Sequence, residues 1–319
     1  MNSRERVLTA LKLGQPDMVP FFDNVNPGMR RKIMGRDDFD DVDFAREIHF
    51  DAIDFYGFTP PFLAEKGENM LERGLIKDRD DLKKITFPVL NDAYIAQGRQ
   101  FVEKYGKSDL ALFYRTRLGP SFIIQSMGYE DFSYALFDDP YVVETFMDLY
   151  VEWAVRLIQK VRTIGFDFAW FADDVAFKNA MMFDPGIYRE VFVPRMKLIV
   201  NELKGGLWAY HSDGNIMPIL EDLLELGMNG LNPIEPGAID IEELKRDYGH
   251  RVCLIGNVDL DYKLTLGTPE EVREEVKQRI EVVGKGGGYI IASSNSLPDY
   301  CKLENVLAMR DAIDMYRKY

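Results

Sequence analysis

The sequence predicts an α/β fold of the (β/α)8 type, a TIM barrel, with residues 1–319 forming a single domain. Short apolar runs alternate with helical patterns along the whole chain, which is typical of parallel strands joined by crossover helices. Eight such runs can be identified. Eight strands favour a closed barrel over a doubly wound open sheet, which the same alternation also permits.

The predicted strands are short and mostly apolar on both faces, as buried parallel strands must be. They are Val19–Phe22, Ala52–Tyr56, Leu110–Tyr114, Phe168–Ala172, Leu207–Tyr210, Gly230–Asn232, Val252–Ile255 and Tyr289–Ala292. Glycines at the ends of the preceding helices introduce several of them, at Gly165, Gly205–Gly206, Gly227 and Gly286–Gly288.

The segments between the strands carry helix signals. Asp139-Pro-Tyr-Val-Val-Glu and Thr268-Pro-Glu-Glu-Val each begin with a cap, a proline in the first turn and an acidic residue. The first 18 residues predict a helix that precedes the first strand. Residues 58–105 are longer than one βα unit requires, so we expect extra helices between the second and third strands.

Composition excludes several classes of function. The net charge of −14 opposes binding to nucleic acid or to an anionic membrane surface. A small anionic substrate remains compatible, because Arg115 and Arg117 can dominate a pocket locally. The two cysteines cannot form a Cys-x-x-Cys zinc site. We expect a cytoplasmic protein without a membrane span, since no signal-like segment or sufficiently long apolar run occurs.

Polar residues concentrate after the predicted strands, where parallel α/β folds carry their sites. From these positions we expect substrate to be bound by Asp173, Arg115, Arg117, Tyr210, Asn232, Glu235, Asn257 and Asn295. A polar residue in such a position could instead cap a helix, and Arg115 could instead pair with a neighbouring carboxylate on the rim. The adjacent acids Asp173 and Asp174 point in different directions, so one is expected to cap and one to face the pocket. Two close carboxylates would supply an acid/base pair or hard metal ligands.

His211 is the most informative single residue. The chain has three histidines, and His211 alone follows directly from a strand into the predicted catalytic face. His49 lies before the second strand, and His250 lies in a turn at the opposite end of the barrel. We therefore predict that His211 is catalytic, together with Asp174 and Asp213. The alternative is a rim histidine held by an ordinary hydrogen bond.

At these residues the sequence resembles the uroporphyrinogen decarboxylase superfamily, which includes corrinoid-linked methyltransferases and O-demethylases. The resemblance covers nearly the whole chain. It is carried by Arg4-Glu-Arg-Val-Leu-Thr-Ala-Leu, Pro16-Asp-Met-Val-Pro, Phe50-Asp-Ala-Ile-Asp, His211-Ser-Asp-Gly-Asn, Gly256-Asn-Val-Asp, Gly267-Thr-Pro-Glu-Glu-Val and Gly286-Gly-Gly-Tyr-Ile-Ile. The family's fold is a (β/α)8 barrel, in agreement with the strand count.

Departures from the family's motifs indicate the branch. The decarboxylases carry Arg-Gln-Ala-Gly-Arg-Tyr after the first strand, where this chain has Asp23-Asn-Val-Asn-Pro-Gly-Met-Arg-Arg. Their essential Asp after the second strand is matched here by Phe58. The methyltransferases often hold zinc with His-x-Cys and a later Cys, where this chain has His211, Asp213 and Asn295. Thiolate zinc is therefore excluded at those positions.

An oxygen-rich metal site remains compatible with the resemblance, because O-demethylating members are linked to Glu and His ligands. We expect Asp174, Glu190 and His211 to form an O,O,N site suited to zinc. For Glu190 the alternative is a solvated helix position. Without a metal, His211 with Asp174 or Asp213 would act as a general acid on a leaving oxygen.

Three functions follow from these observations. The first is transfer of a methyl group from a small substrate, such as an aryl methyl ether, to the cobalt of a separate corrinoid protein. The second is cofactor-free decarboxylation of a porphyrinogen or another acid, as in the decarboxylase branch. The third is ligand binding without catalysis. A homodimer is left open by the sequence.

Overall fold

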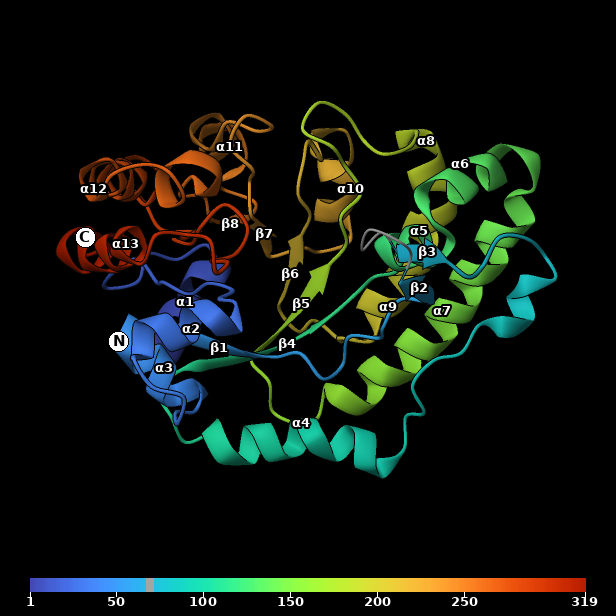
Figure 1. Cartoon of the computed structure of the whole chain (residues 1–319), viewed down its shortest axis with the longest axis horizontal. Helices are drawn as coiled ribbons and strands as arrows, with labels where there is room; N and C mark the ends of the chain where they lie inside the picture. The colour runs from blue at the N-terminus through green and yellow to red at the C-terminus, as the bar shows by residue number, and fades with distance from the viewer. Residues whose placement is uncertain (67–71) are drawn as a thin grey trace.

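A parallel, curled sheet forms the centre of the protein (Figure 1). The computed structural model describes residues 1–66 and 72–319. The sheet has seven strands in the order β1-β4-β5-β6-β7-β8-β9, and each neighbouring pair is parallel. The strands are β1 (Ala52–Phe55), β4 (Ala111–Thr116), β5 (Phe168–Ala172), β6 (Trp208–His211), β7 (Gly230–Asn232), β8 (Cys253–Ile255) and β9 (Tyr289–Ile290). Seven of the eight predicted runs are therefore confirmed as parallel strands of a TIM-barrel-like fold.

The eighth run, Val19–Phe22, does not form the regular strand that was predicted. It makes one isolated parallel bridge, between Phe21 and Ile291. Hydrogen bonds still join it to both edges of the sheet: the Ile291 amide donates to Pro20 O (2.9 Å), and the Asp51 amide donates to Phe21 O (2.7 Å). Pro20 has no amide hydrogen, and the Phe21 amide donates to the Asp51 carboxylate, so a continuous ladder cannot form.

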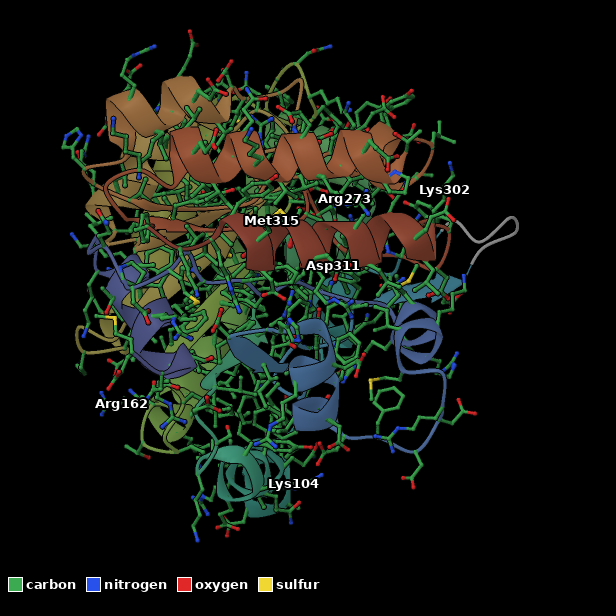
Figure 2. The ribbon with its side chains drawn as sticks, turned by 90° about the vertical axis from the view of Figure 1, so that its left-hand side faces the viewer. Lys104, Arg162, Arg273, Lys302, Asp311 and Met315 are labelled. Carbon is green, nitrogen blue, oxygen red and sulfur yellow. The ribbon has the colours of Figure 1, made fainter. Side chains whose placement is uncertain are left out.

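Helices surround this sheet (Figure 1). They are α1 (Ser3–Leu11), α2 (Pro27–Met34), α3 (Asp41–Ile48), α4 (Asp92–Tyr105), α5 (Pro120–Met127), α6 (Tyr129–Asp138), α7 (Pro140–Val161), α8 (Pro185–Ile187), α9 (Val193–Asn201), α10 (Leu220–Glu225), α11 (Ile241–Tyr248), α12 (Pro269–Gln278) and α13 (Leu303–Tyr316). The predicted helix starts at Asp139 and Thr268 are confirmed, and Thr268 forms a capping box with Glu271. Figure 2 shows α12, which carries Arg273, lying beside α13, which carries Asp311 and Met315.

The prediction of extra helices within residues 58–105 is wrong for the described part of that segment. The structure has an antiparallel hairpin of β2 (Ala64–Lys66) and β3 (Glu72–Gly74), a short 3₁₀ turn at Asp81–Lys84 and the crossover helix α4. Prolines at positions 60, 61 and 88 interrupt helical spacing on both sides of the hairpin. No helix in the described ranges combines the length and apolar character needed to cross a membrane.

Aromatic side chains fill the interior of the curled sheet. The rings of Phe22, Phe113, Phe168 and Trp170 pack together with centroid separations between 4.6 and 6.3 Å. Phe113, Phe168 and Trp170 alternate along β4 and β5, so every second residue of these strands points inward. The next inward positions toward the carboxyl ends of the strands therefore form the floor of any site.

Candidate functional site

Strand alternation brings three polar side chains together at the carboxyl ends of β5 and β6. His211 is the last residue of β6 and points to the same face as Ala172 of β5. Two residues further along, Asp174 and Asp213 return to that face. The Asp213 amide donates to Asp174 Oδ1 (3.0 Å), which ties the two loops together. The predicted grouping of His211, Asp174 and Asp213 in one cluster thus matches their placement.

The geometry of this cluster leaves room for an ion. His211 Nε2 lies 3.7 Å from Asp174 Oδ1 and 3.9 Å from Asp213 Oδ1. Both separations are too long for hydrogen bonds. Asp213 Oδ1 is buried and has no hydrogen-bond partner among the described residues. Among the described residues this is the one group of three or more His, Cys, Asp or Glu residues whose ligand atoms all lie within 4.8 Å of one another.

Neighbouring polar residues hold the cluster in place. Asn232 Oδ1 lies 2.5 Å from His211 Nδ1, and Asn295 Nδ2 donates to Asp213 Oδ2 (2.5 Å). Glu235 accepts from the Gly214 amide (2.9 Å) and pairs with Lys178 (3.2 Å). These three residues, which were predicted to bind substrate, contact the cluster or its loop: Asn232, Asn295 and Glu235.

Burial changes the protonation of one cluster member. It raises the pKa of the Asp213 carboxyl to about 6, and the negative charges of Asp174 and Glu235 act in the same direction. His211 opposes this effect because its positive form attracts the carboxylate. The surplus of acidic groups around His211 therefore favours a bound cation over an anion.

Arg115 lies beside the cluster but is already paired. It belongs to β4, with its guanidinium over the rings of Tyr56 (4.6 Å) and Trp170 (5.2 Å). Its Nε donates to Asp54 (2.7 Å). Burial raises the pKa of nearby Asp23 to about 6, although the positive charge of Arg115 and hydrogen bonds from Ser293 oppose the shift. Arg115 is thus a wall residue with a carboxylate partner.

The two adjacent acids have different environments. Asp173 has no exposed surface, and its carboxylate accepts from the amides of Leu118 (2.5 Å), Gly119 (3.2 Å) and Ser121 (3.0 Å) and from the Ser121 hydroxyl (2.9 Å). The Asp174 side chain is 49% exposed. Asp173 therefore binds the start of α5, although it was expected to bind substrate. Asp174 is the acid that faces the opening.

Three other predicted substrate-binding residues lie within the protein wall. Tyr210 points away from the face that carries His211 and is therefore fully buried. Its hydroxyl donates to the Asp173 carbonyl (3.2 Å). Asn257 is buried and donates to Ile234 O (2.7 Å). Arg117 donates to Pro60 O (2.9 Å) over the ring of Phe62, and burial lowers its pKa. The structure gives each of these side chains an internal partner.

The prediction that Glu190 is a metal ligand does not agree with the structure. Glu190 is exposed and lies in a π-helical turn, Tyr188–Phe192, whose buried side chains are Tyr188 and Phe192. It is absent from the cluster formed by the described residues, where Asp213 takes the third position. A helix after β5 packs its apolar side on the sheet, so an acidic residue on its other side points to solvent.

Two hollows lie on the β1 side of the sheet, and Asp174, His211 and Asp213 are not among the residues that line them. A cleft of about 440 Å³ is lined by residues including Asp23, Asn24, Asp54 and Tyr56. A void of about 10 Å³ lies further in, between Asp23, Asn24, Arg115, Trp170, Asn232 and Asn295. Because the cleft and the void share Asp23 and Asn24, a ligand in the cleft would approach Asn232 and Asn295, which contact His211 and Asp213.

Two residues of this region were missed from the sequence, Asp23 and Asp54. Asp54 was hidden inside a predicted strand, yet it alternates with the apolar Ile53 and Phe55, which indicates an inward-facing charge. Asp23 directly follows the first predicted strand, the position that drew attention to acids after the fourth. Alternation within the strand would therefore have identified Asp54, and the position directly after a strand would have identified Asp23.

Comparison with known proteins agrees with this architecture. The chain is similar to a methyltransferase structure from Methanosarcina mazei, with a TM-score of 0.74, 19% identity and 99% of both chains covered. It is also similar to a putative vitamin-B12-independent methionine synthase from Listeria monocytogenes, with a TM-score of 0.52, 10% identity, and 95% of this chain and 97% of that chain covered. At these identities the similarity shows the fold.

Curated relatives match parts of the chain. Methylcobamide:CoM methyltransferase MtaA from Methanosarcina barkeri is 27% identical over 173 residues, which are 54% of this chain and 49% of that protein. Uroporphyrinogen decarboxylase from Shewanella halifaxensis is 32% identical over 113 residues, which are 32% of this chain and 29% of that protein. The chain thus spans about half or less of the length of these relatives. The family model for uroporphyrinogen decarboxylase (URO-D) matches residues 120–316, and the chain therefore belongs to the URO-D family.

Proposed function

We propose that this protein is a methyltransferase that moves a methyl group from a small methylated substrate to the cobalt of a partner corrinoid protein. The observation that carries the proposal is the Asp174–His211–Asp213 cluster, which lies at the mouth of the curled sheet and contains a buried, unpaired carboxylate oxygen. A relative named as a methylcobamide methyltransferase supports the same reaction class. An aryl methyl ether is the donor class to test first.

The cluster fits a metal such as zinc. Zinc takes nitrogen and oxygen ligands at about 2.0–2.2 Å and leaves one position open at catalytic sites. Ligand atoms separated by 3.7 and 3.9 Å can close onto one such ion with small side-chain adjustments. The metal would satisfy Asp213 Oδ1, and Asn232 would support His211 as the outer partner that zinc-bound histidines usually have. Bound there, zinc would polarise the oxygen that leaves when the methyl–oxygen bond breaks.

The residues of the chain have defined parts in this reaction. Asp174, half exposed at the mouth, and His211 Nε2 face the position of the leaving oxygen. Trp170 lies beside the His211 ring, with centroids 6.3 Å apart, and offers a flat apolar wall to the substrate. When the methyl group passes to cobalt, the electron pair of the methyl–oxygen bond stays on oxygen. Zinc held by Asp174, His211 and Asp213 would stabilise the negative charge on that oxygen.

The decarboxylase alternative has less support from the geometry. A porphyrinogen with many carboxylates needs several free cationic partners. Arg115 pairs with Asp54 (2.7 Å), Arg30 with Asp41 (2.7 Å) and Arg31 with Asp37 (3.8 Å). These three arginines are therefore already paired with carboxylates.

The proposal is tested by elemental analysis of the purified protein together with a cobalt methylation assay. We expect about one equivalent of metal per chain and methylation of a reduced corrinoid protein from one of a panel of small methyl donors, led by aryl methyl ethers. Carbon dioxide release from uroporphyrinogen, with no cobalt methylation from any donor, would reverse the assignment.

Metal binding should also depend on pH. Because the pKa of Asp213 is raised to about 6 and a metal must displace that proton, zinc affinity should stay nearly constant above pH 6. Below pH 6 it should fall at least about tenfold per pH unit. Titration of zinc against a competing chelator at several pH values measures the zinc affinity. In the Asp213→Asn variant, the part of the pH dependence that is due to the Asp213 carboxyl should be absent. An affinity that is constant between about pH 5 and pH 7 would contradict the assignment of Asp213 as a ligand.

A further inference from the structure

Asn232 connects the strands on either side of it at the level of the cluster. It is the last residue of β7, is 4% exposed and lies opposite His211 in the β6–β7 register. Its Nδ2 donates to the backbone carbonyl of Ile255 in β8 (3.0 Å). Its Oδ1 lies 2.5 Å from His211 Nδ1. One buried side chain thus links Ile255 to the ring of His211.

The Ile255 contact fixes which way the Asn232 amide points. A backbone carbonyl can only accept a hydrogen bond, so the group that faces it must be the NH₂ of Asn232. The oxygen then faces His211, and an oxygen in that position requires a hydrogen on Nδ1. When neutral His211 carries its hydrogen on Nδ1, its Nε2 has no hydrogen and presents a lone pair.

We propose that Asn232 is a positioning residue that holds His211 in the Nδ1-protonated tautomer, with the Nε2 lone pair directed at Asp174 and Asp213. The Nε2 atom of neutral His211 is then an acceptor at the mouth of the curled sheet. This suits a metal ligand or a base, and it disfavours the general acid that the sequence left open. Asn232 acts through His211, because its Nδ2 donates to the Ile255 carbonyl and its Oδ1 faces His211 Nδ1.

The tautomer rests on the hydrogen-bond geometry alone, and only its consequence for metal affinity rests on the proposed function. The chain has three histidines, so ring nitrogen signals in a long-range ¹H–¹⁵N spectrum can be assigned with a His211→Gln variant. In protein freed of metal by a chelator, we expect His211 to show a protonated Nδ1 and an unprotonated Nε2. A protonated Nε2 in the neutral ring of the unaltered protein would overturn the proposal without any variant.

Two substitutions separate positioning from general structure. Asn232→Leu keeps the approximate size of the side chain but removes the acceptor, so His211 should populate both tautomers. Zn²⁺ affinity should then fall about 10- to 100-fold. Asn232→Asp keeps an acceptor for His211 Nδ1 and should therefore retain the tautomer. Its second oxygen cannot donate to the Ile255 carbonyl, so this variant loses that hydrogen bond.

Asn257→Leu is the matched control. Asn257 is likewise a buried asparagine that follows a strand, and it donates to a backbone carbonyl, that of Ile234. This hydrogen bond does not involve His211, so the substitution should leave the His211 tautomer unchanged. Equal effects of Asn257→Leu and Asn232→Leu on the tautomer would refute the positioning role. An unchanged tautomer in Asn232→Leu would do the same. If the tautomer behaves as expected but Zn²⁺ does not bind to the unaltered protein, the metal part of the proposed function fails and the positioning role stands.

Discussion

Replacing His211 with alanine should reduce methyl transfer to cobalt by at least about 100-fold while the protein remains folded. The loss is expected because His211 supplies the one nitrogen of the cluster and sits between its two carboxylates. The fold should survive because the side chain makes one hydrogen bond, to Asn232, at the edge of the mouth. The measurements are the initial rate of cobalt methylation, the metal content and the thermal unfolding curve of the same preparation.

His250→Ala is the matched control for this experiment. His250 is exposed in the turn that precedes β8, at the opposite end of the sheet from the cluster. It should therefore keep the rate, the metal content and the unfolding temperature of the unaltered protein. Unchanged turnover in His211→Ala would remove the cluster from the mechanism. Loss of metal with unchanged turnover would instead make the metal structural.

The sequence was sufficient to predict that His211, Asp174 and Asp213 lie close together, because parallel strands deliver their carboxyl ends to one edge of the sheet. Period-two alternation also accounts for the different environments of Asp173 and Asp174. This alternation predicts side-chain direction for two or three residues beyond a strand, because the backbone stays extended there.

Predictions that depended on longer segments were less successful. Glu190 was assigned from the resemblance to family members with Glu and His ligands, which does not determine which side of a helix an acid occupies in this chain. Helices were expected where the structure has the hairpin of β2 and β3. The prediction was based on segment length, which does not distinguish a helix from a hairpin. Arg115 was predicted to bind substrate, but it pairs with Asp54, which lies on a neighbouring strand and is distant in sequence. Pairings of this kind depend on strand register, which the sequence does not specify.

Asp173→Ala should cause the largest loss of stability among the substitutions discussed, about 3–5 kcal/mol in the free energy of unfolding. The Asp173 carboxylate is fully buried and accepts four hydrogen bonds, three from backbone amides at the start of α5 and one from the Ser121 hydroxyl. Alanine would leave those donors buried without a partner, and each such donor costs about 1–3 kcal/mol unless water reaches it. Urea denaturation followed by circular dichroism measures the change.

Asp174→Ala provides the comparison one residue away. The Asp174 side chain is half exposed and accepts one hydrogen bond, from the Asp213 amide, so its loss should cost less than about 1 kcal/mol. Its effect should appear in zinc affinity and in the rate of methyl transfer, because the Asp174 carboxylate faces the ion position. If Asp174→Ala destabilised the fold as much as Asp173→Ala, the division between a wall acid and a site acid would be wrong. The alternation of side chains after β5 would then no longer explain how two adjacent aspartates take different parts.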